Sequence, residues 1–175
     1  MKFLPMSLLV AAVALSACTN PNRFGGDDAL SNPTNPVGGT PLNGVVPGSA
    51  NDPTSTVYFN QTVGDRVLFE VDQSTLTAGG RATLDGQATW LTTNNDYQAV
   101  IEGHADEQGT REYNLALGAR RANAAREYLL SKGVPSERLR VVSYGKERPI
   151  EICSNEACYA KNRRAVTVLA GGQTS

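Results

Sequence analysis

The 175-residue chain is short of the residues on which most catalytic and metal sites depend. One histidine and three cysteines leave little for a zinc site with several ligands or for a Cys/His catalytic pair. Neither charge is in excess, because 16 Lys and Arg face 17 Asp and Glu, and this argues against a nucleic-acid-binding protein. No apolar run reaches the roughly 18–20 residues of a membrane-spanning helix. These absences predict a small domain without a metal, so motifs have to indicate its function.

The N-terminus has the features of an export signal that ends at a cysteine. Lys2 precedes an apolar stretch over residues 6–15, which is of signal-peptide length. The stretch runs into Leu15-Ser16-Ala17-Cys18, which resembles a bacterial lipobox. This resemblance implies that residues 1–17 are removed and that Cys18 becomes a lipidated N-terminus; the alternative is an ordinary signal peptide with Cys18 near the cut by chance. Thr19 in place of the Asp of an inner-membrane retention signal favours the outer membrane.

A segment rich in turn-forming residues follows the cysteine. Residues 19–54 contain six Pro, six Gly and six Asn, and their apolar residues show no period. Such a segment cannot bury enough surface to offset the entropy of ordering it. We therefore predict a disordered linker over residues 18–55, able to reach about 120 Å when extended, then a domain over 56–170 and a tail over 171–175.

From Thr56 onward, strand and helix patterns alternate. Strands are predicted at residues 67–71, 99–103, 139–144 and 165–169, with a shorter candidate at 57–59. Helices are predicted from an N-cap at Thr77 to about Thr93 and from Tyr113 to Lys132, the second ending at Gly133. The apolar face expected for the second helix consists of Leu115, Ala119, Ala122, Ala125 and Leu129. The alternation predicts an α/β sandwich in which helices pack on one sheet.

The turn after the second strand is the most polar stretch of the domain. It reads GHADEQGT over residues 103–110, directly before the long helix. On that helix Asn114, Leu117 and Arg121 form a stripe offset from the apolar one, so we expect Arg121 to point away from the core toward Asp106. A carboxylate and a guanidinium facing one pocket would suit a zwitterion. Spacing alone leaves the alternative of a surface salt bridge that contributes little.

Three motifs in order point to a known family. They read EGHADEQGTREYNLALGARRANAAREYL, VVSYGKERP and KNRRAV. Together they resemble the OmpA-like peptidoglycan-binding domain over residues 57–169, most closely that of the peptidoglycan-associated lipoproteins of Gram-negative bacteria. The resemblance implies a two-layer sandwich with helices on a mixed β-sheet. It also implies non-covalent binding of the meso-diaminopimelate in the peptidoglycan stem peptide, with no catalysis and no cofactor.

The resemblance assigns the binding residues one by one. The family's loop acid matches Asp106, its helix arginine matches Arg121, and a second acid matches Asp72. Further positions that would line or brace the groove are Val71, Tyr113, Asn114, Leu117, Asn162 and Arg163. Val71 stands where the family often has Phe or Leu, and Arg163 could equally be structural.

Two other motifs admit more than one interpretation. His104 could be a metal ligand or a general base, but a satisfied structural histidine that supports the loop is favoured because a metal needs several further ligands. Adjacent acids at Asp106 and Glu107 rarely flank one glycosidic bond from both sides, so a glycosidase is disfavoured. Cys153 and Cys158 are expected to form a disulfide in an oxidising periplasm, since a metal half-site would lack its other half.

The sequence thus predicts a non-enzymatic lipoprotein that tethers the outer membrane to the cell wall. The resemblance further implies a partnership with TolB and other proteins of the Tol system. Two rival hypotheses are a protein-interaction hub in which wall binding is secondary, and a muramyl hydrolase.

Overall fold

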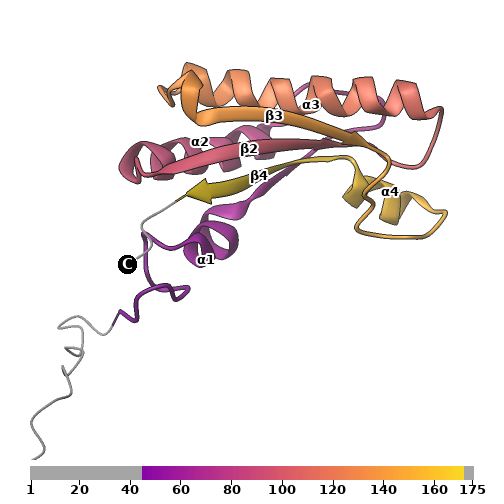
Figure 1. The fold of residues 1–175 in the computed structure, drawn as a ribbon. Helices are drawn as coiled ribbons and strands as arrows, with labels where there is room; N and C mark the ends of the chain where they lie inside the picture. The colour runs from indigo at the N-terminus through magenta and orange to yellow at the C-terminus, as the bar shows by residue number, and fades with distance from the viewer. Residues whose placement is uncertain (1–44, 172–175) are drawn as a thin grey trace, which may run out of the picture. The chain divides into compact units, whose positions relative to one another are not determined.

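A computed structural model describes residues 45–171 of the chain (Figure 1). The predicted signal peptide, Cys18, most of the predicted linker and the last four residues lie outside the described range. The elements follow in this order: α1 (Thr56–Tyr58), the π-helical turn η1 (Phe59–Gly64), β1 (Arg66–Leu68), α2 (Ala78–Thr93), β2 (Tyr97–His104), α3 (Arg111–Ser131), the 3₁₀ turn η2 (Ser136–Arg138), β3 (Leu139–Gly145), α4 (Glu156–Asn162) and β4 (Arg164–Gly171).

The four strands form one mixed sheet in the order β1-β4-β2-β3. β4 pairs antiparallel with both β1 and β2, whereas β2 and β3 are parallel and are joined through α3. α3 runs along β2 and β3 (Figure 1), and α2 packs against β1 and α3. One core cluster joins the inward side chains of the strands to those of both helices. The predicted α/β sandwich with helices on a mixed sheet is confirmed.

Both long helices begin where a threonine caps the first turn. The hydroxyl of Thr77 accepts a hydrogen bond from the backbone N–H of Gly80 at 3.0 Å, and Thr110 does the same for Tyr113 at 3.2 Å. Gly133 ends α3 with φ of +95°, a left-handed conformation that favours glycine. These local signals explain why the sequence predicts α2 and α3 closely.

The buried face of α3 differs from the predicted one. Leu115 is 41% exposed, whereas the polar Asn114 and Arg121 are buried. The buried positions are Asn114, Leu117, Gly118, Arg121, Ala122, Ala125 and Leu129. The prediction that Arg121 points away from the core is therefore wrong.

Two predictions for the start of the domain also differ from the structure. The strand candidate at residues 57–59 is wrong, because Ser55 caps a helical turn there and Phe59 enters the core with its ring 4.9 Å from that of Trp90. The linker was predicted to run to residue 55, but its end is ordered. The Trp90 indole donates to the carbonyl of Pro53 at 2.7 Å, and the Tyr97 hydroxyl donates to that of Thr54 at 3.0 Å.

α3 approaches β2 closely at two facing glycines. A Cβ atom built on Gly103 would lie 1.8 Å from the carbonyl oxygen of Gly118, far inside van der Waals contact. Gly118 in turn has only 2.5 Å of room before the hydroxyl of Ser143. The absence of both side chains lets the first turns of α3 lie directly beside the end of β2, where the polar loop begins.

Candidate functional site

A pocket of about 260 Å³ opens where β1 and β2 end and α3 begins. Its lining residues are Val71, Asp72, Asp106, Gln108, Gly109, Tyr113, Asn114 and Leu117. The structure thus brings together six of the nine predicted binding or bracing residues, drawn from three separate segments of the chain. Arg121 and Arg163 do not line the pocket, although both make contacts just behind it.

The Asp106 carboxylate is held in a fixed position by its own loop and by Arg163, which lies between α4 and β4. Its Oδ1 accepts from the backbone N–H of Gln108 at 3.2 Å, and its Oδ2 accepts from Nη1 of Arg163 at 3.2 Å. Asn114 and Lys146 hold the rest of the loop by donating to the carbonyls of Gln108 and Gly109 at 2.6 and 2.7 Å. An acidic group is therefore presented to the pocket by a loop anchored on several sides.

Asp72 supplies a second carboxylate from the segment after β1. Its φ of +58° makes it the one non-glycine residue in the described range with left-handed backbone geometry. Such geometry costs on the order of 1 kcal/mol and is found preferentially at functional sites. The Tyr113 hydroxyl donates to Asp72 Oδ1 across the pocket mouth. Tyr113 and Val71 are about half exposed, so the two acids have a partly apolar rim.

Arg121 lies buried beneath the loop rather than on the surface. Its guanidinium donates to the carbonyls of Gln73, His104 and Glu70 at 2.8, 2.9 and 3.2 Å. Burial lowers the pKa of Arg121 to about 10, an effect that the charge of Asp106 partly opposes. Arg121 therefore remains charged at neutral pH and ties the segment after β1 to the end of β2, close to Asp106.

Arg163 forms a second cationic support behind Asp106. It is 3% exposed, and besides Asp106 it pairs with the carboxylate of Glu156 and donates to the carbonyl of Phe69 at 3.2 Å. Burial alone would lower the pKa of Arg163, but hydrogen bonds to Glu156 and Asp106 outweigh it and raise that pKa. Arg163 is therefore a fixed positive charge shared between two acids.

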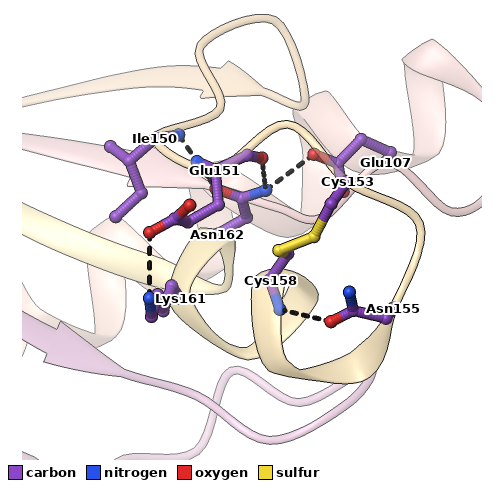
Figure 2. The surroundings of a disulfide bond; sticks show 8 residues. All are labelled: Glu107, Ile150, Glu151, Cys153, Asn155, Cys158, Lys161 and Asn162. Atoms are coloured by element: carbon purple, nitrogen blue, oxygen red, sulfur yellow. Dashed lines mark hydrogen bonds and ion pairs between the residues drawn. A yellow bond between two sulfur atoms is a disulfide. The ribbon is translucent and has the colours of Figure 1, made fainter. Parts of the chain in front are cut away.

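Asn162 connects the binding loop to the segment before α4, as Figure 2 shows. Its side-chain nitrogen donates to Glu107 Oε1 at 2.6 Å and to the carbonyl of Glu151 at 2.8 Å. Its side-chain oxygen accepts from the backbone N–H groups of Ile150 and Glu151 at 2.9 and 3.2 Å. Because Asn162 is fully buried and uses both of its donors, its side chain has one permitted orientation.

Cys153 and Cys158 form a disulfide next to this network (Figure 2). The bond joins the first turn of α4 to the loop before it, and the Asn155 side chain caps the same turn by accepting from the backbone N–H of Cys158 at 3.2 Å. The disulfide expected from the sequence is therefore present and links residues only five positions apart. The structure adds that this helix ends with Asn162 and is followed directly by Arg163.

His104 is buried at the end of β2, but it is not the satisfied histidine that the sequence suggested. Neither ring nitrogen has a hydrogen-bond partner among the described residues, and Glu102 Oε2 lies 3.7 Å from Nε2. Burial, together with the charges of Arg164 and Arg148, lowers the pKa of His104 to about 4. Its imidazole is therefore neutral at physiological pH and packs near the ring of Tyr144.

This pKa predicts a loss of stability on mild acidification. An unfolded chain protonates its histidine near pH 6.5, whereas the folded domain resists until about pH 4, so stability falls as the pH drops through this window. From pH 7.5 to 5 we expect the free energy of unfolding to decrease by about 2 kcal/mol. Urea denaturation at both values measures this, and His104→Phe should remove most of the difference. An unchanged difference in that variant would contradict the assignment, since His104 is the only histidine.

Other regions of the described range have fewer features of a binding or catalytic site. Two larger hollows, of about 750 and 460 Å³, lie around residues 47–58 and the end of α2, and neither is lined by Asp72 or Asp106. Residues 45–171 contain no cluster of three His, Cys, Asp or Glu side chains suited to a metal ion. Within the same range no helix has the length and apolarity to cross a membrane.

Several residues of the site were not predicted. Gln108 and Gly109 line the pocket and belong to the polar turn already singled out, so their neighbours could have indicated them. Lys146 and Glu156 support the site from other segments; Lys146 belongs to the motif VVSYGKERP, whereas no local pattern marks Glu156.

Comparisons with known proteins agree on one family. The OmpA family matches residues 68–163. The chain is 47% identical over 166 residues to the peptidoglycan-associated lipoprotein of Rhizobium meliloti. This alignment covers 95% of this chain and 87% of the relative. It is 53% identical over 122 residues to that of Brucella melitensis, covering 70% of this chain and 73% of the relative. The crystal structure of the peptidoglycan-associated lipoprotein from Burkholderia pseudomallei superposes on this structure with a TM-score of 0.62 and is 37% identical in sequence. The superposition covers 69% of this chain and 98% of the crystallised chain.

Proposed function

Because this chain belongs to the OmpA family and, within it, to the peptidoglycan-associated lipoproteins, we propose that it binds peptidoglycan non-covalently and ties it to the outer membrane. The observation that carries the proposal is the placement of Asp72 and Asp106 at one pocket with a buried arginine behind them. The ligand is the meso-diaminopimelate residue of the stem peptide, whose side chain ends in an ammonium and a carboxylate.

The ammonium binds at the two acids. Asp106 is fixed by the Gln108 amide and by Arg163, so it needs no rearrangement to accept a charge-assisted hydrogen bond. Asp72 faces the same space from the opposite side, next to the Tyr113 hydroxyl. Each hydrogen bond to a charged group contributes roughly 1.5–3 kcal/mol.

The carboxylate is drawn toward Arg121. A guanidinium has five N–H groups, and the three hydrogen bonds from Arg121 to carbonyls leave two of them without a partner in the described range. Its buried position shields this charge from solvent, so attraction to a carboxylate entering the pocket is stronger than at the surface. Arg121 thus combines support of the loop with recognition of the ligand.

The rest of the chain serves attachment. We propose that Cys18 carries the lipid that holds the protein in the outer membrane at its periplasmic face, and that the segment before the domain spans the distance to the wall. Many anchored copies facing one polymer then bind with avidity, so each contact can be modest. We further propose that TolB and the Tol system are partners during cell division.

Binding without bond cleavage fits the geometry of the acids. Glu107 Oε1 is taken up by Asn162, and Glu107 does not line the pocket. Glu107 therefore cannot act together with Asp106 on one glycosidic bond, as the paired acids of a glycosidase do. The relatives are likewise named as associated with peptidoglycan rather than as enzymes.

Asp106→Asn tests the binding site directly. The substitution keeps shape and removes the charge that meets the ammonium, so co-sedimentation with purified peptidoglycan should weaken at least about tenfold, equivalent to roughly 1.4 kcal/mol. Asp96→Asn is the matched control, because Asp96 is exposed and lies before the opposite end of β2.

Peptidoglycan of a different composition provides a second test of the same site. Peptidoglycan with lysine in place of diaminopimelate keeps the ammonium and lacks the carboxylate, so the parent protein should bind it weakly. If the Asp106 variant is folded and sediments like the parent, or if both walls bind equally, the proposed site is wrong.

A further inference from the structure

We infer that Glu156, held in place by the Cys153–Cys158 disulfide, is a positioning residue that sets how strongly the Asp106 pocket attracts an ammonium group. The inference rests on the proposed binding of diaminopimelate and concerns the regulation of that same pocket. Glu156 lies outside the pocket and reaches it only through Arg163, which pairs with Glu156 and Asp106 at once.

Arg163 is the point at which the two acids compete. Its Nη1 lies 3.2 Å from Asp106 Oδ2 and 3.4 Å from Glu156 Oε2, while its Nη2 contacts Glu156 Oε1. The shared guanidinium cannot fully neutralise either partner. Because it also donates to the Phe69 carbonyl at 3.2 Å, it has little freedom to shift from one acid to the other.

The charges around the pocket show what Glu156 contributes. Glu156 places one negative charge on the same guanidinium that pairs with Asp106. This added charge favours a cation at the pocket. Without Glu156, Asp106 would be the only carboxylate among the described residues that pairs with Arg163.

The disulfide fixes the helix that bears Glu156. Glu156 is the first residue of α4, which has only seven residues and is too short to be stable alone. The Cys153–Cys158 bond closes the loop around this residue, and Asn155 caps the turn (Figure 2). The Glu156 side chain is 64% exposed, so its position depends on this backbone support more than on packing.

The experiment measures binding of a synthetic stem peptide ending in meso-diaminopimelate to the lipid-free protein that begins after Cys18. Glu156→Gln should weaken binding about threefold to tenfold at 0.05 M salt. At 0.5 M salt the deficit should largely vanish, because exposed charges are then screened within a few ångströms. A purely structural defect would persist at both salt concentrations. Glu151→Gln is the matched control, since that carboxylate pairs with Lys161 at 2.9 Å and not with Arg163.

A second variant tests the part played by the disulfide. Replacing both cysteines with serine should weaken binding in the same salt-dependent way, and adding Glu156→Gln to it should cause little further loss, because both changes act through one contact. Equal binding by the parent and Glu156→Gln, or strictly additive losses in the combined variant, would overturn the inference and leave the proposed function standing. A parent that does not bind the peptide would instead refute the proposed ligand itself.

Discussion

Arg121→Ala is expected to destabilise the domain by about 3–5 kcal/mol, in the range seen when one partner of a buried charged contact is removed. The substitution removes the donor of the buried His104 carbonyl and of the partly buried Gln73 and Glu70 carbonyls, and the loss of a buried hydrogen bond costs roughly 1–3 kcal/mol. Thermal and urea denaturation measure the effect. Loss of wall binding by this variant alone would therefore not identify a ligand contact.

The neighbouring arginine provides the control. Arg120 is exposed on the same helix, so Arg120→Ala should change stability by less than about 0.5 kcal/mol. Arg121→Lys separates the two roles of Arg121, because it keeps the charge but cannot reach three carbonyls with a planar fork. We expect it to recover part of the stability and little of the binding. Equal stability of the Arg120 and Arg121 alanine variants would contradict the buried role.

Gly103→Ala is expected to cost about 3 kcal/mol or more, because the added methyl group has no room. Its Cβ would lie 1.8 Å from the Gly118 carbonyl oxygen, and this neighbour is backbone that can move only if α3 moves. The displacement would shift the first turns of α3 relative to the Asp106 loop. Wall binding should therefore fall along with the melting temperature.

Gly79→Ala is the matched substitution at an open site. A Cβ there would meet nothing closer than the Thr77 hydroxyl at 4.0 Å, and alanine favours a helix over glycine. This variant should be unchanged or up to about 1 kcal/mol more stable. If Gly103→Ala melts like Gly79→Ala, the close contact between β2 and α3 is not as tight as the structure has it.

Local patterns in the sequence were enough to predict four strands and the two long helices, because strand patterning, apolar periodicity and the Thr77 cap act over a few residues. The first predicted strand was too long, since β1 ends at Leu68 and not at Val71. The same patterns failed for α1. Val57 and Phe59 resemble a strand, but the cap at Ser55 and the burial of Phe59 against Trp90 decide the conformation. α4 was missed because seven residues are too few for a clear helical period.

Six of the nine candidate residues line one pocket, but the sequence did not indicate that Arg121 lies buried beneath it. A charged side chain is normally assigned to the outside of a helix, so Arg121 was expected to face the pocket directly. Two of its carbonyl partners lie 48 and 51 residues away in the sequence, in a segment without helix or strand. Nothing within α3 indicates those acceptors, and only the folded chain brings them to the guanidinium.

The opposite placement of the ordered N-terminal segment and the binding loop determines how the domain would carry mechanical load. The segment ending at Thr54 contacts Tyr97 at the start of β2, and the Asp106 loop begins where β2 ends, eight residues later (Figure 1). In the proposed function, tension between the membrane and the wall would thus run lengthwise through the sheet. Because the N-terminal segment leads through α1 and η1 into β1, the hydrogen bonds of the antiparallel β1–β4 ladder would then be loaded along the strand and sheared together instead of being unzipped singly. Such a geometry lets several bonds of about 1 kcal/mol each resist one pull.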